Sequence, residues 1–564
     1  MILGKKEVKS VFATVSGIGT TTADIAKLWA ERIPQLGIIT TKSIGKEPKE
    51  GNAEPIICQV SKRSFRNAVG LSNPGCEAFA EELRKIYPLP GGKFLLTSIF
   101  GKDAEELRYV AMKLAPYSDG LELNFSCPHA EQGYGASIGS SEELTYELTK
   151  AVKESVKMPV VVKLAPNVKD IAKIAKAAER AGADAISAIN TSEPKEFLDA
   201  YTKKPILTNT IGGLSGEEIR KAGLKCVKEI SQAVSIPIIG IGGVFSAKDV
   251  QEYLDAGASI IGIGSALAGM STEKVMRYFE MLESDLENKT NNASKLVAND
   301  NIMCYQPFKI KKIETLDSDL KIFYFDKSIA AKPGQFVFTW IPGHHEKPFS
   351  IADDAPLTLV VRKVGHHTSK LFQLREGDTL MIRGPYGNSS SFKKSDRVIL
   401  VGGGTGAAPL RFLAKQLKNP IIFLGCRKNK HLLFKKEFES FGKLIATSED
   451  SNQGCYKLVT EALEDYLSKE NVENVYFFNC GPESMMKAAF EIEKEYTSLD
   501  KIFCCVERYC ACGVGLCGKC AIDGLRLCVD GPVFEGMRLE ISQDFGNFRR
   551  EKNGKRTSFS TSVC

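Results

Sequence analysis

Short apolar segments alternate with amphipathic segments along the first half of the chain. The apolar segments are rich in β-branched residues and read VFATVSG, GIITT, KFLLTSIF, GLELNFS, PVVVKLA, AISAIN, PIIGIGG and SIIGIGS. Such near-continuous apolar runs are typical of parallel strands that are buried on both faces. The segments between them, for example DIAKIAKAAERAG, have the periodicity of helices that cover a sheet. We therefore predict an α/β fold, a TIM (β/α)8 barrel over residues 1–282.

The pattern changes repeatedly after this barrel. Residues 283–302 are polar and lack periodicity, so we predict a linker. Strands without intervening helices over residues 303–394 predict a small antiparallel β-barrel. A strand, a glycine turn and a helix return over residues 395–500, as in an α/β nucleotide-binding domain. Residues 501–548 are predicted to form a cysteine-rich domain, and residues 549–564 a disordered tail.

Charge and hydropathy limit the function classes. The net charge of +7, from 75 basic and 68 acidic residues, is spread along the 564 residues, which argues against nucleic-acid binding. No apolar run approaches the roughly 20 residues of a membrane span, and the first residues lack the apolar core of a signal peptide. We therefore expect a cytoplasmic protein. Seven of the 16 cysteines lie between residues 504 and 528, a density that indicates metal binding rather than structural disulfides.

The segment CACGVGLCGKCAIDGLRLC contains the strongest motif. Four of its cysteines have the C-x4-C-x2-C spacing of plant-type 2Fe-2S proteins, followed by a shortened last gap. We predict these four as the cluster ligands: Cys512, Cys517, Cys520 and Cys528. A structural zinc site is the alternative, although zinc sites usually pair two C-x2-C knuckles. The neighbouring Cys504, Cys505 and Cys510 are not expected to be ligands.

The segment VGGGTGAAP follows a predicted strand and precedes a predicted helix. Gly402, Gly404 and Ala407 fit the G-x-G-x-x-A motif, and Gly406 lies inside it. In this context backbone N–H groups approach a pyrophosphate at a helix N-terminus, which predicts a nicotinamide-nucleotide site. A merely tight turn is the alternative. The basic stretch CRKNKH, after the next strand, leaves NAD and NADP both open.

Polar and glycine residues stand where the predicted barrel strands end, on the face that carries TIM-barrel active sites. They are Ser16, Lys42, Ser98, Asn124, Cys127, Lys163, Asn190, Gly242, Gly243, Gly264 and Ser265. The pairs after the last two strands predict a phosphate cup that suits FMN or a sugar phosphate. Lys42 and Lys163 are suited to stabilise an anionic reduced flavin, or they are solvated surface lysines.

Several motifs occur in order and spacing as in class 1 dihydroorotate dehydrogenases. They are SG at 16, TTKSI, NAVGLSNPG, LNFSCP, VKLAPN, INT, IGGLSG, GIGGV and IGIGS. The predicted β-barrel, nucleotide domain and cysteine loop resemble the electron-transfer subunit of the type 1B enzymes, which carries FAD and a 2Fe-2S cluster. The chain thus resembles a class 1B catalytic subunit fused to its electron-transfer subunit.

The resemblance implies two sets of ligand-binding residues in the first barrel. FMN would contact Ser16, Lys42, Ser43, Ser98, Asn124, Lys163, Ile189, Gly216, Gly242, Gly243, Gly264 and Ser265. Substrate would contact Lys42, Asn67, Ala68, Val69, Gly70, Leu71, Asn124, His129, Asn190 and Thr191. Asparagine suits a pyrimidine because its amide both donates and accepts hydrogen bonds.

Cys127 matches the catalytic base of the family, which removes a proton from C5 while C6 delivers hydride to the flavin. A thiol suits this role because its unperturbed pKa of about 8.5 lies within reach of neutral pH. His129 stands where the family has the asparagine of its SCPN motif. The histidine either donates to the same substrate group, faces solvent in the lid without a role, or marks a changed substrate.

In the electron-transfer half, the resembling family holds FAD with an R-P-x-S motif and a later G-T pair. The matching residues are Lys347, Pro348, Phe349, Ser350, His367 and Thr368. Lysine thus replaces an arginine that binds phosphate through two N–H groups, and histidine replaces a glycine. FAD is still the expected cofactor of this barrel.

The resemblance predicts an NAD-dependent dihydroorotate dehydrogenase of pyrimidine (UMP) biosynthesis. Electrons would pass from FMN through the 2Fe-2S cluster and FAD to NAD bound at Gly402, Gly404 and Gly406. The expected partners are a small pyrimidine, a nicotinamide nucleotide and a second copy of the chain in a homodimer through the barrel. The alternatives are a related flavoprotein that oxidises another dihydropyrimidine, such as dihydrouracil, and an electron-transfer module whose barrel no longer binds substrate.

Overall fold

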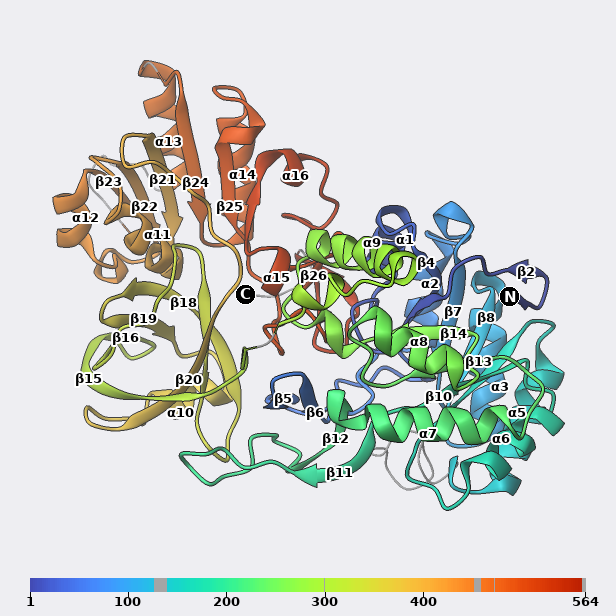
Figure 1. Cartoon of the computed structure of the whole chain (residues 1–564). Helices are drawn as coiled ribbons and strands as arrows, with labels where there is room; N and C mark the ends of the chain where they lie inside the picture. Colours follow the sequence, from blue (N-terminus) through green and yellow to red (C-terminus); the bar gives the residue numbers. More distant parts are fainter. Residues whose placement is uncertain (126–138, 299, 451–457, 471, 560–564) are drawn as a thin grey trace. The chain divides into compact units, whose positions relative to one another are not determined.

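The computed structural model describes residues 1–125, 139–298, 300–450, 458–470 and 472–559 (Figure 1), so the predicted base Cys127 and its neighbour His129 lie outside the described residues. The chain divides into two compact units. One comprises Met1–Met303, Val514–Arg526 and Arg550–Arg556. The other comprises Cys304–Gly513, Leu527–Arg549 and Thr557–Cys564. The cysteine-rich segment therefore contributes to both units.

A closed barrel of parallel strands forms the centre of the first unit. Its strands are, in spatial order, β10 (Ala185–Ala188), β13 (Ile238–Ile241), β14 (Ile260–Ile263), β3 (Phe12–Thr14), β4 (Leu36–Thr40), β7 (Phe94–Ile99), β8 (Gly120–Asn124) and β9 (Val160–Leu164). Every residue of β9, VVVKL, is buried, which explains why such strands are apolar without alternation. The predicted TIM barrel is confirmed.

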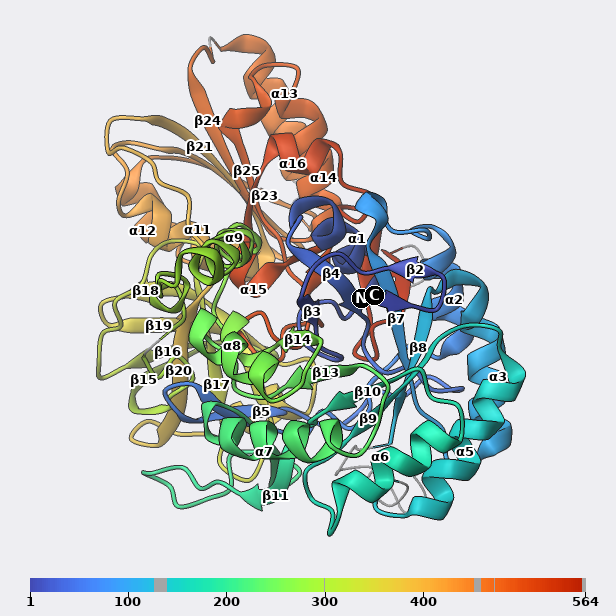
Figure 2. The same ribbon diagram turned by 45° about the vertical axis from the view of Figure 1, so that its right-hand side comes forward.

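Helices cover the outside of these strands (Figure 2). They are α1 (Ala23–Arg32), α2 (Cys76–Arg84), α3 (Ala104–Leu114), α5 (Glu142–Ser155), α6 (Ile171–Arg180), α7 (Arg220–Ser231), α8 (Ala247–Asp255) and α9 (Thr272–Asn288). In α6 the Asp170 carboxylate accepts the N–H of Lys173 and caps the first turn, while Ile174 packs into the core. The amphipathic pattern of the sequence thus has its expected physical basis.

A small antiparallel sheet accompanies the barrel. Its strands are, in order, β11 (Ser192–Glu196), β12 (Ile211–Gly216), β6 (Ser64–Asn67) and β5 (Ile57–Ser61). Asn67 pairs with Gly213, and Ser64 pairs with Gly216. The pairing of β6 with β12 therefore sets the positions of Asn67, where the predicted substrate loop begins, and of Gly216, a predicted flavin residue.

Two polar segments make more contacts than their sequences predict. The stretch expected to be a linker from residue 283 begins inside α9. Its Ala293 is fully buried in the barrel core, and the Ala293 N–H donates to the Asp285 carboxylate at 2.7 Å. Arg550, in the stretch expected to be a disordered tail, is 5% exposed and donates to Asp24 and Glu82. Local polarity did not reveal these contacts, since the partners of Arg550 lie at the other end of the chain.

The second unit contains a closed antiparallel barrel and a six-stranded sheet. The barrel strands are, in order, β15 (Gln306–Asp317), β16 (Leu320–Phe325), β19 (Leu357–Arg362), β18 (Glu346–Asp354), β17 (Phe336–Trp340) and β20 (Thr379–Tyr386). The sheet strands are β23 (Lys443–Ser448), β22 (Ile421–Cys426), β21 (Arg397–Gly403), β24 (Val475–Cys480), β25 (Ile502–Cys505) and β28 (Val533–Glu535). Only the β25–β28 pair is antiparallel within the described sheet.

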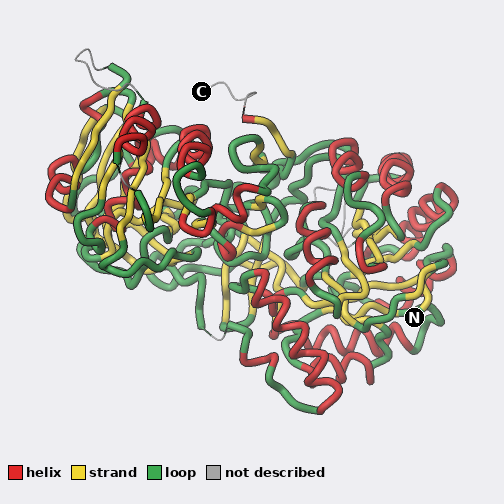
Figure 3. Tube along the Cα trace, turned by 90° about the horizontal axis from the view of Figure 1, so that it is seen from above, coloured by secondary structure: helices red, strands yellow, loops and turns green. Residues whose placement is uncertain are grey.

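Helices lie beside this sheet (Figure 3). They are α11 (Ala407–Ala414), α12 (Lys435–Phe441), α13 (Val459–Lys469) and α14 (Glu483–Glu493). The shorter helices of the unit are α10 (His366–Leu371), α15 (Leu527–Asp530) and α16 (Gly536–Glu540). The predicted order of small β-barrel and α/β domain is confirmed. Among the described residues, none of the helices combines the length and apolar character that crossing a bilayer requires.

Candidate functional site

A cavity of about 210 Å³ lies where the strands of the TIM barrel end. Predicted FMN residues that line it are Ser16, Lys42, Ser43, Asn124, Lys163, Ile189, Gly216, Gly242, Gly243, Gly264 and Ser265. Predicted substrate residues that line it are Lys42, Asn67, Val69, Gly70, Leu71, Asn124, Asn190 and Thr191. Ser98 and Ala68 are buried and do not line it. The fold thus brings residues from most of the barrel sequence to one cavity.

Side-chain hydrogen bonds join the ends of several barrel strands at this cavity. The Ser43 hydroxyl lies 3.2 Å from that of Ser16 and 2.9 Å from that of Ser98. Asn124 Nδ2 donates to the Ser43 hydroxyl at 2.9 Å, and Asn190 Nδ2 donates to Asn124 Oδ1 at 3.4 Å. Because neighbours hold each side chain, these polar groups are oriented in advance. Such donors and acceptors suit the alternating amide edge of a flavin or a pyrimidine.

Two lysines line the cavity in different electrostatic settings. Lys163 is 4% exposed, and its Nζ lies 3.7 Å from the Glu122 carboxylate on the neighbouring strand. Lys42 is half-buried, and its burial together with the positive charge of Lys519 lowers its pKa to about 7. The charge of Lys163 is therefore compensated within the barrel, whereas a bound anion would stabilise the charged form of Lys42.

The cavity also receives residues that the sequence did not indicate. They come from the cysteine-rich segment: Leu516, Cys517 and Lys519. Backbone hydrogen bonds of 2.9 Å attach this segment to the barrel, from Gly19 N–H to the Leu516 carbonyl and from Gly269 N–H to the Val514 carbonyl. Neither bond has a local sequence signal, because the two segments are distant along the chain.

Close packing reinforces this attachment. A Cβ on Gly518 would lie 1.6 Å from Thr21 Oγ1, so the segment approaches the barrel where only glycine fits. The fully buried Arg526, on the short hairpin of β26 (Ala521–Ile522) and β27 (Leu525–Arg526), donates to the carbonyls of Gly515 and Met270. The position of Lys519 between these anchors is therefore set by several contacts.

The predicted cluster ligands have the chemistry that an iron–sulfur cluster needs. Cys512, Cys520 and Cys528 are 1–2% exposed, and the half-buried Cys517 lines the barrel cavity. All four lie in a glycine-rich segment of the chain. Buried thiols with backbone N–H groups nearby are suited to ligate and solvate a cluster.

A buried ion pair in the second unit reaches the first cluster ligand. The Arg383 guanidinium binds both carboxylate oxygens of Glu346, at 2.7 and 2.9 Å, and both residues are at most 2% exposed. Arg383 Nη1 also donates to the Cys512 carbonyl at 2.9 Å. The pair therefore links strands β18 and β20 to the start of the cluster loop.

We expect Arg383→Met to destabilise the second unit by about 3–5 kcal/mol, because it leaves the Glu346 carboxylate buried without its cationic partner, with the neutral Tyr305 hydroxyl still donating to it. Urea unfolding and iron content measure the effect, and the iron content should fall with stability. The double variant Arg383→Met, Glu346→Leu is the control and should recover most of the lost stability, since it removes both charges. Equal stability of the single variant and the wild type would contradict this account.

The FAD motif of the β-barrel is only partly accessible. Lys347, Pro348, Phe349 and Ser350 are consecutive, half-buried residues of β18. His367 is 2% exposed beside Thr339 Oγ1, at 2.9 Å from its Nε2, and burial lowers its pKa to about 3, which keeps it neutral. The Thr368 hydroxyl accepts the N–H of Gly365 and caps α10. The half-buried residues of β18 therefore offer exposed surface to a flavin, and FAD binding by His367 and Thr368 stays a prediction.

The glycine turn lies at the carboxyl edge of the second sheet. It connects β21 to α11 through a 3-10 turn at Gly404–Gly406. A Cβ on Gly406 would lie 2.1 Å from the Cys480 carbonyl oxygen at the end of β24, so the turn packs there only as glycine. Open α/β sheets bind nucleotides at this edge, so the position of the turn fits the predicted dinucleotide pyrophosphate site.

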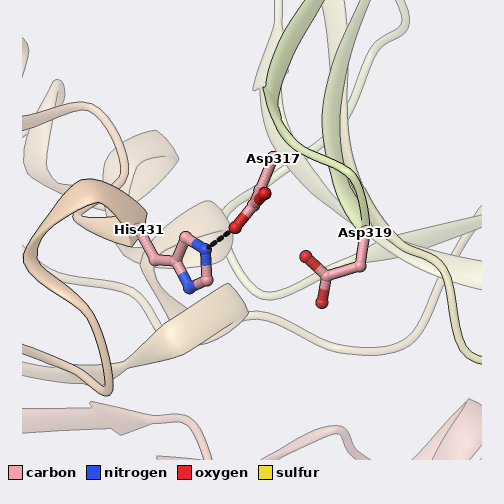
Figure 4. A group of neighbouring side chains, drawn as sticks. All are labelled: Asp317, Asp319 and His431. Atoms are coloured by element: carbon pink, nitrogen blue, oxygen red, sulfur yellow. Dashed lines mark hydrogen bonds and ion pairs between the residues drawn. The ribbon is translucent and has the colours of Figure 1, made fainter.

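An acidic cluster elsewhere in the second unit has a structural explanation. His431 Nε2 approaches an oxygen of Asp317 at 2.6 Å, near Asp319 (Figure 4). Lys430 pairs with Asp317 and Arg362 pairs with Asp319, each at 2.8 Å. Hydrogen bonds from Lys430 and His431 hold the pKa of Asp317 well below its usual range. Because both carboxylates already have cationic partners, the cluster joins the β15–β16 hairpin to the nucleotide domain rather than forming a metal site.

The fold and the cavity define a class of protein. The TIM barrel has a polar cavity suited to a flavin, with a cysteine loop at that cavity. The second unit has a reductase-type β-barrel and a nucleotide domain. These parts are those of a flavin-dependent oxidoreductase with its own electron-transfer module.

Comparison with known families agrees. The family model "Dihydroorotate dehydrogenase" matches residues 2–285, "Oxidoreductase NAD-binding domain" matches residues 400–491, and "Iron-sulfur cluster binding domain of dihydroorotate dehydrogenase B" matches residues 507–540. The chain belongs to the dihydroorotate dehydrogenase family.

Curated relatives match the barrel half. The catalytic subunit of dihydroorotate dehydrogenase B (NAD(+)) from Methanocaldococcus jannaschii is 44% identical over 263 residues, 46% of this chain and 84% of that protein. The corresponding subunit from Pyrococcus horikoshii is 47% identical over 232 residues, 41% of this chain and 74% of that protein. A crystal structure of DHODH from Eimeria tenella with ferulenol is 18% identical, covers 52% of this chain and 86% of that chain, and has a TM-score of 0.43.

Proposed function

We propose that this chain oxidises dihydroorotate to orotate and passes the electrons to NAD+. The observation that carries the proposal is the barrel cavity, where oriented hydroxyl and amide groups, two barrel lysines and the predicted cluster ligand Cys517 meet. The match of one chain to dihydroorotate dehydrogenase, iron–sulfur and NAD-binding models supports it. When bound, FMN would accept the hydride, and the 2Fe-2S cluster and FAD would relay the electrons.

Different side chains of the cavity would bind the FMN phosphate, the flavin ring and the substrate. Glycines and Ser265 after the last two strands suit the FMN phosphate, and Lys163 with the linked serines suits the flavin ring. Asn124 and Asn190 suit the substrate amides because each offers a donor and an acceptor. We assign the removal of the C5 proton to the thiolate of Cys127, by its match to the family.

The test is a substrate screen on the purified protein. Dihydroorotate added without oxygen should bleach the FMN absorbance, and NAD+ should restore it. Bleaching by dihydrouracil but not by dihydroorotate would overturn the proposal in favour of another dihydropyrimidine, a possibility raised by His129. Absence of FMN, with FAD and iron present, would favour a pure electron-transfer module.

Two further properties belong to the proposal. We infer a homodimer formed through the barrel, as the family resemblance implies, and light scattering of the intact protein tests it. We infer a cytoplasmic location, which the cysteine spacing supports, since it indicates an iron–sulfur cluster rather than disulfides and such thiols persist in reducing compartments.

A further inference from the structure

We propose that Lys519, which the cysteine-rich segment places in the barrel cavity, determines substrate specificity: its ammonium group, with that of Lys42, binds the carboxylate of an anionic substrate. The inference rests on the proposed function and deepens it. It concerns a residue between two predicted cluster ligands, Cys517 and Cys520, that belongs to the first unit together with the barrel.

Lys519 occupies the part of the cavity beside the predicted substrate loop. The residue is 4% exposed, and its Nζ donates to the Glu50 carbonyl at 3.4 Å. The chain next to Glu50 is bonded to the loop, since Asn52 N–H donates to the Val69 carbonyl at 3.1 Å. Val69 itself lines the cavity. The ammonium group is therefore bonded two residues from the point where this chain segment joins the loop expected to contact substrate.

The charges in the cavity favour an anion at this place. Lys163 is paired with Glu122, whereas Lys42 forms no ion pair with a carboxylate of the described residues. Lys42 and Lys519 both line the cavity and are close enough for their charges to interact. Two neighbouring ammonium groups repel each other in a partly desolvated site, and a bound carboxylate converts that repulsion into attraction.

The substrate is favoured over the flavin phosphate as the source of the anion. The glycine pair Gly242 and Gly243, with Gly264 and Ser265, follows the last two barrel strands, where TIM barrels bind phosphate. Lys42 follows the second strand along the chain, and Lys519 is bonded at Glu50 just beyond it. The two lysines therefore lie with the substrate loop rather than with the phosphate cup.

The test compares ligands with and without a carboxylate on the holoenzyme. Orotate and uracil are titrated against the FMN absorbance of wild type, Lys519→Met and Lys519→Arg, and flavin reduction by dihydroorotate is followed without oxygen. We expect Lys519→Met to weaken orotate binding roughly 10- to 100-fold, as for a lost charge-assisted hydrogen bond. Uracil binding and the maximal rate of flavin reduction should change little, and Lys519→Arg should retain most of the orotate affinity.

Lys552→Met is the matched control. Lys552 contacts the carboxylate of the same Glu50, at 3.6 Å, but does not line the cavity. The control should leave orotate affinity unchanged. Cluster EPR and FMN content of each variant report whether the loop and the cofactor site are intact.

Three results would overturn the inference. Orotate affinity could stay unchanged in Lys519→Met, uracil could weaken as much as orotate, or the variant could lose FMN, which would assign the charge to the cofactor phosphate. If dihydroorotate fails to reduce the wild-type flavin, the proposed function itself is wrong. Flavin reduction of the wild type therefore tests the proposed function, and the Lys519 variants test the inference separately.

Discussion

Replacement of Cys127 by serine is expected to slow flavin reduction by dihydroorotate by roughly 10²- to 10⁴-fold at neutral pH, the usual contribution of a positioned general base. The serine hydroxyl is far less acidic than the thiol, so almost none of it is ionised at pH values where a thiolate forms. FMN content should not change, because the base is expected to contact substrate. Anaerobic stopped-flow spectroscopy of the flavin absorbance measures the rate.

The pH profile supplies the control for this variant. In the wild type, the rate should rise with pH as the thiolate forms, because only the deprotonated thiol accepts the C5 proton. The serine variant should lose this rise over the same range. Cys226→Ser, which alters a buried core cysteine of α7, should keep both the rate and the profile. Equal rates of Cys127→Ser and wild type near neutral pH would remove Cys127 from the mechanism.

Replacement of Cys528 by serine is expected to abolish electron transfer to NAD+ while dihydroorotate still bleaches FMN. Cys528 is a predicted cluster ligand, 2% exposed in α15, whereas the cavity belongs to the barrel unit. Loss of one thiolate should prevent assembly of the 2Fe-2S cluster. Iron content, EPR of the reduced protein and NAD+ reduction measure the two halves of the reaction separately.

Cys510→Ser is the matched control for the cluster. Cys510 is 4% exposed and two positions before the predicted ligand Cys512, but it falls outside the ligand spacing. This variant should retain iron, the EPR signal and NAD+ reduction. If Cys510→Ser loses the cluster while Cys528→Ser keeps it, the ligand assignment taken from the spacing is wrong.

Much of the architecture followed from periodicity alone. The apolar runs of β9 and β14 predicted buried parallel strands, and the alternation with amphipathic segments such as α6 predicted the barrel. The glycine turn at Gly404 was identified by its place between a strand and a helix. These signals are local, since strand burial, helix amphipathicity and turn geometry act over a few residues.

Contacts between distant segments could not be predicted in this way. Polar composition indicated a disordered tail around Arg550, whereas its guanidinium is buried against Asp24 and Glu82. The partners of this guanidinium were decided by packing between distant segments, for which the sequence carries no neighbouring signal.

The sequence by itself determined the barrel, the order of the electron-transfer elements, the cysteine spacing and most residues that line the cavity. Only the tertiary structure decided that the segment Val514–Arg526 packs on the barrel and adds Cys517 and Lys519 to its cavity. The physical reason is that this attachment is made largely to backbone groups: two backbone hydrogen bonds, the Arg526 side chain on the Met270 carbonyl, and a close glycine contact at Thr21. Nearly every residue carries the same backbone N–H and C=O groups, so the residue pattern does not predict which of these groups will pair.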